Sequence, residues 1–298
     1  MGRETLLTLL IVLFGGLVMQ PLALLPWRLR PDATPRLAER RAWAQLWAPV
    51  VPMLLVGAWL CGWALREPDP VRTRFDHGMI IGASLPFAVL ALRAVLRAAW
   101  ALVREPAHLP VCTVGLWRPR VVVDPLFARQ LDEGPLRAAL EHECAHARHR
   151  DPLRIWLGQL AADLQWPWPR AHRRFQAWLE WLEHARDDEA RGHGASATDL
   201  AAAVVATARR LPPMRAVTRG ARLLPGEAAL LGDPRLLASR IERLLQPLPE
   251  GCGLSGPSGW SDAAALIVLG LVLCAALALG AAYGNDFLHP FLLWTRSA

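Results

Sequence analysis

One short stretch decides the fold class expected of this chain: His142-Glu143-Cys144-Ala145-His146, with the pattern H-E-x-x-H. On an α-helix, His142 and His146 lie about 400° apart around the axis, so their imidazole rings project from one face, one turn apart. Two such nitrogens bind Zn²⁺ at about 2.0–2.1 Å, and Glu143 then lies beside the metal as a general base for a water molecule. A helix that merely carries two surface histidines is the alternative interpretation.

A catalytic zinc ion needs a third protein ligand and an open coordination position. The charged segment 180–189 reads E-W-L-E-H-A-R-D-D-E, and Glu183 and Asp187 share one face of a helix there. We expect Glu183 to bind the metal. Asp187, one turn on, is expected to accept a hydrogen bond from the second nitrogen of a ligating histidine, which fixes its tautomer. The residues of the same segment that compete for these roles are Glu180, His184, Asp188 and Glu189.

The composition indicates a membrane protein with a sizeable polar part. The chain is 53% hydrophobic and 20% charged, too apolar for an ordinary soluble domain and too polar to lie entirely within a bilayer. Four apolar stretches are each long enough to cross about 30 Å of hydrocarbon. They are residues 5–25, 43–65, 77–103 and 263–283. We expect four transmembrane helices, and disfavour a cleaved signal peptide because the first stretch exceeds its usual apolar length.

The arginines set the expected orientation in the membrane. The net charge of +7 comes from 33 arginines without a single lysine. Five of them follow the first span, whereas the loop after the second span is balanced. By the positive-inside rule, the first loop and the long third loop face the cytoplasm, and both termini face outward. The expected location is therefore the inner (plasma) membrane, as a multi-pass protein without direct nucleic-acid contact.

The part between the third and fourth spans is expected to be an α+β domain. The β-branched runs at 111–114 and 120–123 flank a Gly- and Pro-containing turn, which predicts a hairpin. Such an edge would allow an extended substrate to pair by strand addition, with a purely structural hairpin as the alternative. Helices are expected at 135–150, 153–168, 170–191, 196–211 and 234–245. The tryptophan-rich segment 153–168 is expected to be an interfacial or a buried core helix.

The chain is thus expected to be mainly α, a polytopic membrane protein with a cytoplasmic zincin-like metallopeptidase domain. Residues 1–103 would hold three transmembrane helices, and residues 104–262 the peptidase domain. Residues 263–298 would hold the fourth transmembrane helix and a short extracytoplasmic tail.

This order of features resembles the M56 family of membrane zinc metallopeptidases, the antirepressor type related to the β-lactam sensor-transducers. The resemblance is carried by H-E-x-x-H-x-x-x-R-D at 142–151 and E-x-x-x-D-D at 183–188, with supporting residues at 114–119 and 195–200. It implies zinc bound by His142, His146 and Glu183, with Glu143 as the base. The implied activity is hydrolysis of a peptide bond in a cytoplasmic protein, in signalling or regulated proteolysis.

Two departures from the family pattern stand out. The sensor-transducers carry a penicillin-binding domain outside the last span, with a serine activated by lysine. This sequence has fifteen residues after Tyr283 and no lysine, so we do not expect it to carry that sensor itself. Arg186 stands where family members often have alanine or cysteine, and it is expected to bring a cation near the ligand face.

The expected partners are a protein substrate, with a transcriptional repressor as one candidate, and the lipid bilayer. A second copy of the chain or a separate sensor protein are further candidates. Two other functions remain open. One is a catalytically inactive membrane signalling scaffold with the same fold. The other is an M48-like membrane metallopeptidase, which also combines H-E-x-x-H with E-x-x-x-D. The sequence identifies no residue that stabilises an oxyanion.

Overall fold

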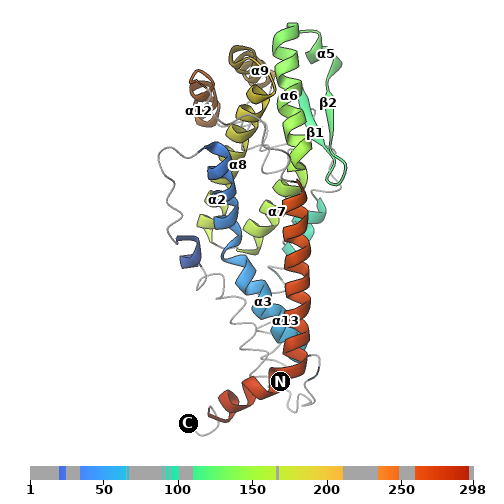
Figure 1. The fold of residues 1–298 in the computed structure, drawn as a ribbon, viewed down its shortest axis with the longest axis vertical. Coiled ribbons are helices and arrows are strands. Elements are labelled where there is room, and N and C mark those ends of the chain that lie inside the picture. The colour runs from blue at the N-terminus through green and yellow to red at the C-terminus, as the bar shows by residue number, and fades with distance from the viewer. Residues whose placement is uncertain are drawn as a thin grey trace.

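The computed structural model describes residues 20–24, 34–64, 66, 89, 92, 93, 95–100, 110–165, 168–210, 234–247 and 259–294. This part is mainly helical, with one two-stranded sheet. Its helices and strands are η1 (Gln20–Leu24), α2 (Pro35–Trp47), α3 (Val50–Ala64), β1 (Val111–Val114), β2 (Arg120–Val123), α5 (Pro125–Ala128), α6 (Glu133–His149), α7 (Asp151–Leu164), α8 (Pro169–Gly192), α9 (Ala197–Arg210), α12 (Pro234–Leu244) and α13 (Gly259–Trp294). The hairpin and most helices gather at one end of the molecule, and α3 and α13 form the other (Figure 1).

The predicted hairpin is confirmed. Strands β1 and β2 pair antiparallel, with Val111 opposite Val123. The turn between them contains Gly115 at φ +98°, a left-handed conformation that favours glycine. The hairpin and α5 pack on α6 and α9 around Val111, Phe127 and Ala203. Strand β1 is thereby fixed beside the helix that carries the H-E-x-x-H motif.

A single residue separates α6 from α7. Arg150 adopts φ 53° and ψ 42°, the left-handed region, where it ends α6 and caps α7. The boundary expected between the helices at 135–150 and 153–168 lies at this residue, and Asp151-Pro152 begins the second helix. The prediction of a helix from residue 153 was two residues short, because Pro152 is tolerated in the first turn of a helix. Asp151 is fully buried at this junction.

A second core joins α2, α7 and α8. Its buried centre consists of Leu46, Val50, Ala161, Ala162, Phe175, Trp178, Leu179 and Leu182. Helix α7 approaches α8 closely at Gly158, where an added Cβ would lie 3.0 Å from the Phe175 ring. One face of the tryptophan-rich segment is therefore a buried core face. Helix α2 lies along α8 and extends almost directly into α3 (Figure 1).

Two helices in the described residues are long and apolar enough to cross a membrane, against the four that the sequence predicts. They are Pro35–Trp63 and Ile267–Gly284, which match the second and fourth predicted spans. The first and third predictions, 5–25 and 77–103, lie mostly outside the described residues. The helix that contains the second predicted span begins before residue 43. It starts at Pro35 and includes a polar segment ahead of the apolar run.

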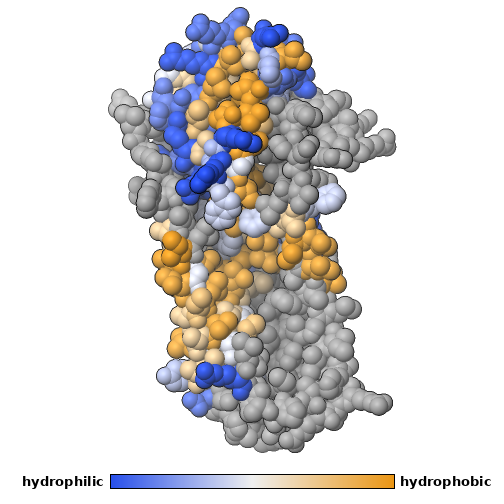
Figure 2. All heavy atoms as spheres, turned by 90° about the vertical axis from the view of Figure 1, so that its right-hand side faces the viewer, coloured by the Kyte–Doolittle hydropathy of each residue, from blue (hydrophilic) through white to orange (hydrophobic). Residues whose placement is uncertain are grey.

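Helices α3 and α13 are in close backbone contact. A Cβ added at Gly280 would lie 1.8 Å from the carbonyl oxygen of Trp59, and one at Gly62 would lie equally close to that of Leu277. Small residues allow such approach between helices in membranes. The outer face of α13 exposes Ile267, Val268, Leu271, Leu279 and Tyr283. Hydrophobic residues accordingly cover much of the described surface along this half of the molecule, with a few hydrophilic residues at its tip, while most hydrophilic residues lie at the other end (Figure 2).

Candidate metal centre

Helix α6 presents His142, Glu143 and His146 to one cavity. The helix begins after Asp132 in an extended N-cap conformation, and Glu133 in its first turn complements the helix dipole. Both histidines are buried, and their rings lie edge to face with centroids 4.7 Å apart. The helical spacing therefore brings the two imidazoles together as the sequence predicts.

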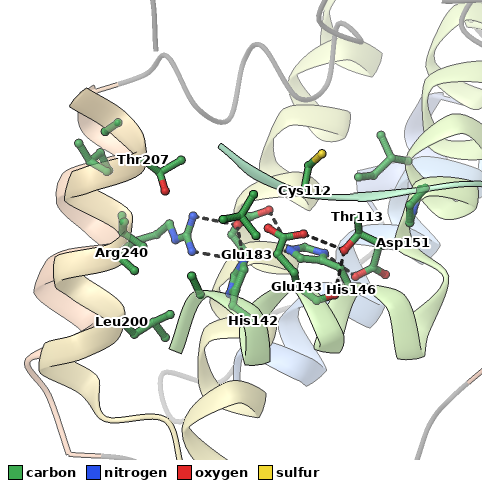
Figure 3. A pocket seen from close by; sticks show the side chains of 18 residues that line it. Cys112, Thr113, His142, Glu143, His146, Asp151, Glu183, Leu200, Thr207 and Arg240 are labelled. Atoms are coloured by element: carbon green, nitrogen blue, oxygen red, sulfur yellow. Dashed lines mark hydrogen bonds and ion pairs between the residues drawn. The ribbon is translucent and has the colours of Figure 1, made fainter. Parts of the chain in front are cut away.

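Helix α8 brings Glu183 to the same point. The Nε2 atoms of His142 and His146 are 3.1 Å apart. The Glu183 oxygens lie 3.4 Å from His142 Nε2 and 3.6 Å from His146 Nε2 (Figure 3). Donors bonded at about 2.0–2.1 Å to one tetrahedral ion are separated by about 3.3 Å, so the three residues have the spacing of a zinc site.

Each histidine has its second nitrogen on a buried carboxylate. His142 Nδ1 lies 2.9 Å from Asp187 Oδ1, and His146 Nδ1 lies 2.8 Å from Asp151 Oδ2. The hydrogen bond to Asp151 assigns the His146 ring proton to Nδ1, and the contact with Asp187 favours the same tautomer for His142, so both Nε2 atoms face each other and the Glu183 carboxylate. Two imidazole nitrogens and a carboxylate that converge in this way fit a divalent cation, which would take the place of a proton shared among them. The structure thus brings Asp187 to His142, and adds Asp151, to which the sequence analysis assigned no role in the site.

Each of these two carboxylates is held by a buried arginine. Arg240 donates to Asp187 from Nε and Nη2, at 2.9 and 2.7 Å. Arg186 donates to Asp151 from Nε and Nη2, at 2.5 and 2.9 Å. Arg186 brings a cation near the site, as expected from the sequence. It pairs with Asp151 rather than with the triad, and supports His146 through that carboxylate.

Arg240 is the functional residue that sequence reasoning missed. Besides Asp187, its Nη1 contacts Glu183 Oε2 at 2.9 Å, and its Nη2 lies 3.5 Å from His142 Nε2. A signal for it exists in the sequence, because Leu236, Arg240 and Leu244 are spaced by four residues and share the buried face of α12. An arginine in line with two buried leucines needs a buried anionic partner.

Glu143 contacts β1. Thr113 Oγ1 lies 2.7 Å from Glu143 Oε2 and 2.9 Å from the Glu143 carbonyl oxygen. The threonine therefore orients one carboxylate oxygen and leaves the other available to the cavity (Figure 3). The predicted hairpin supplies this contact, but no local pattern could pair Thr113 with Glu143.

Charges around the cavity perturb two of the ligands. Burial raises the pKa of Glu183, but the positive charge of Arg240 outweighs it and holds the pKa at about 2. Burial lowers the pKa of His142, but hydrogen bonds to Asp187 and Glu183 outweigh it and raise the pKa to about 9. Glu183 is therefore ionised at neutral pH, and a bound metal would displace a proton from His142.

The cavity at this site has a volume of about 130 Å³. The ligand triad and Glu143 lie on one side, next to β1 (Figure 3). The facing wall comes from α9 and α12. It is mostly apolar, with Leu200, Ala203, Val204, Ala208 and Leu237, and it also carries Thr207 and Arg240. Because a water molecule takes about 30 Å³ in the liquid, the cavity has room for several waters or a side chain.

The four competing residues of segment 180–189 do not join the triad. Asp188 pairs with Arg243 at 2.7 Å. Glu189 pairs with His149 at 2.7 Å and with Arg148 at 2.9 Å. His184 stacks edge to face on Trp181. In the part of the chain that the structure describes, the converging group is His142, His146 and Glu183.

The resemblance to M56 peptidases depends on the motif residues and their order along the chain. Comparison of the chain with protein-family models, curated proteins and solved structures found no match.

Proposed function

We propose that this chain is an integral membrane zinc-dependent endopeptidase of the M56 type. His142, His146 and Glu183 bind the zinc ion, and Glu143 is the general base. The observation that carries the proposal is the meeting of three potential ligand groups at the spacing of one tetrahedral ion, with Glu143 lining the same cavity.

The chemistry follows from the position of each side chain. Bound zinc acts as a Lewis acid that acidifies a water molecule and polarises the scissile carbonyl. The free oxygen of Glu143 takes a proton from the attacking water and passes it to the nitrogen of the departing amine, while Thr113 holds the other oxygen. Asp187 and Asp151 keep the two imidazoles in the ligating tautomer.

The substrate is a protein segment that binds between β1 and the apolar wall formed by α9 and α12. The membrane helices α3 and α13 anchor the site, and the spans predicted at 5–25 and 77–103 complete a four-helix topology. In this arrangement the peptidase domain faces the cytoplasm and both termini face outward. A cytoplasmic repressor or a partner membrane protein is the substrate class that this location favours.

The test uses the full chain in detergent or nanodiscs, with zinc content and cleavage of a denatured protein pool read by mass spectrometry. We expect about one zinc per chain in the wild type. Glu143→Gln should keep the zinc and lose cleavage by about 10²–10⁴-fold, the usual contribution of a general base. A wild type that cannot be loaded with zinc would identify a non-catalytic scaffold instead, and cleavage that persists in Glu143→Gln would show that Glu143 is not the general base. If the peptidase activity is found, proteins captured by the Glu143→Gln variant would identify the substrate.

A further inference from the structure

A chain of buried ion pairs leads from α2 to the metal ligand His146. Glu39 Oε1 on α2 lies 2.5 Å from Arg154 Nη2 on α7. Arg154 Nη1 in turn lies 3.2 Å from Asp151 Oδ1, and Asp151 Oδ2 lies 2.8 Å from His146 Nδ1. All four residues are buried.

Glu39 lies in the polar first turns of a helix that continues into a candidate membrane span. It lies near the start of Pro35–Trp63, the first of the two apolar helices. A buried carboxylate is costly unless it is paired, and Arg154 pairs with it. Trp43, also on α2, and Trp178 on α8 lie 5.4 and 5.7 Å from the Arg154 guanidinium, at cation–π distance. Helix α2 therefore fixes Arg154 at two points.

The position of Arg154 affects Asp151 directly. The Asp151 carboxylate is shared among Arg154, Arg186 and His146. If the negative charge of Glu39 were removed, Arg154 would lose one of its two carboxylate contacts. The guanidinium would then move toward Asp151 and draw negative charge away from His146 Nδ1. A histidine with a weaker carboxylate partner is a less basic and less well oriented metal ligand.

We propose that Glu39 is a positioning residue for His146, acting through Arg154 and Asp151, so that the placement of the α2–α3 helix sets the metal affinity of the site. This inference rests on the zinc site proposed above. It makes α2 part of the metal centre, although no residue of α2 lines the cavity.

Helix α7, which carries Asp151 and Arg154, offers a matched control. Asp163 is a second buried acid of α7, and it pairs with Arg97 at 3.0 Å and Arg93 at 3.4 Å. It lies twelve residues after Asp151, about 18 Å along the helix, and outside the ion-pair chain. Asp163→Asn therefore removes the ion pairs of a buried α7 acid with two partly exposed arginines, without reaching His146.

The experiment titrates the full-length protein in nanodiscs with Co²⁺ alone, against a chromophoric chelator. The variants are Glu39→Gln, Asp163→Asn, Asp151→Asn and the double variant Glu39→Gln/Asp151→Asn. The readouts are the dissociation constant and the Co²⁺ d–d absorption bands, which report the geometry of the ligands. Arg154→Lys is a further variant of the ion-pair chain. It keeps the positive charge of Arg154 but cannot bridge the carboxylates of Glu39 and Asp151.

We expect Glu39→Gln and Arg154→Lys to weaken Co²⁺ binding by about 3–10-fold and to shift the d–d bands, less than the 10–100-fold typical of a direct partner of a ligand. Asp163→Asn should stay within about twofold of the wild type. Glu39→Gln should add nothing in the Asp151→Asn background, because both act through one carboxylate. Wild-type affinity and spectrum in Glu39→Gln and Arg154→Lys, or additive losses in the double variant, would overturn the inference alone. Failure of the wild type to bind Co²⁺ would overturn the proposed zinc site itself.

Discussion

Arg240 on α12 contacts Glu183 on α8, with Nη1 2.9 Å from Oε2. The same guanidinium donates two hydrogen bonds to Asp187. One side chain thus holds both acids of the E-x-x-x-D motif, the proposed ligand and the partner of His142. Because a ligating carboxylate uses one oxygen for the metal, a donor on the other oxygen fixes its direction.

Arg240→Met should therefore lower zinc affinity by about 10–100-fold. Arg243→Met is the control, since Arg243 lies on the same helix and pairs with Asp188 outside the triad. Competition titration with a chelator measures both. Equal affinities in the two variants would show that Arg240 contributes only to the docking of α12.

Glu183→Ala should strip zinc from the purified protein, because it removes one of three ligands. Glu180→Ala, a change on the partly exposed side of the same helix, should leave the zinc content unchanged. Metal analysis after dialysis against a weak chelator compares the two. Equal retention would mean that another carboxylate binds the metal.

Glu189→Gln should destabilise the protein at neutral pH and less so in acid. Burial raises the pKa of Glu189, but the hydrogen bond from His149 and nearby arginines outweigh it and lower the pKa from 4.5 to about 2. A carboxyl group with a lowered folded-state pKa contributes stability above the unfolded value, and this is lost as pH falls toward the folded value. We expect a Tm about 3–6 °C lower at pH 7. Thermal melts at pH 7 and pH 3.5 should show the difference shrinking; a constant difference would contradict the assignment.

Gly280→Ala should destabilise the contact between α3 and α13, since its Cβ would meet the Trp59 carbonyl at 1.8 Å. Forcing a methyl group into such a contact costs about 1–3 kcal/mol. Gly270→Ala on the same helix is the control, because nothing lies within 4 Å of its added Cβ. Thermal unfolding in detergent, followed by tryptophan fluorescence, distinguishes them, and equal Tm values would argue against this helix contact.

The part of the site that was predictable from sequence is the part set by helix periodicity. His142 and His146, and likewise Glu183 and Asp187, are four residues apart, so each pair shares a face whatever the tertiary fold. The contacts of Arg240 with Asp187, of Arg186 with Asp151 and of Thr113 with Glu143 join residues that are distant in sequence. They depend on how α8, α12 and β1 dock against α6, which no local spacing encodes.

The fold shows the same division between features set by local sequence and features set by packing of distant segments. The hairpin and the five helices of the polar part follow from turn residues and apolar periodicity, with ends shifted by a few residues. The start of the α2–α3 helix was missed because 35–42 are largely polar, and their helix is stabilised by packing on α8 rather than by an apolar run.

The left-handed conformation of Arg150 fixes the number of residues between His146 and Asp151. Only this residue separates α6 from α7, and it turns the chain so that Asp151, five positions after His146, reaches back to the imidazole. One inserted or deleted residue at this point would rotate α7 by about 100° and carry the carboxylate away from the ring. The spacing H-x4-D is therefore as rigid a requirement as H-E-x-x-H itself, and any homologue that uses the same carboxylate must keep it.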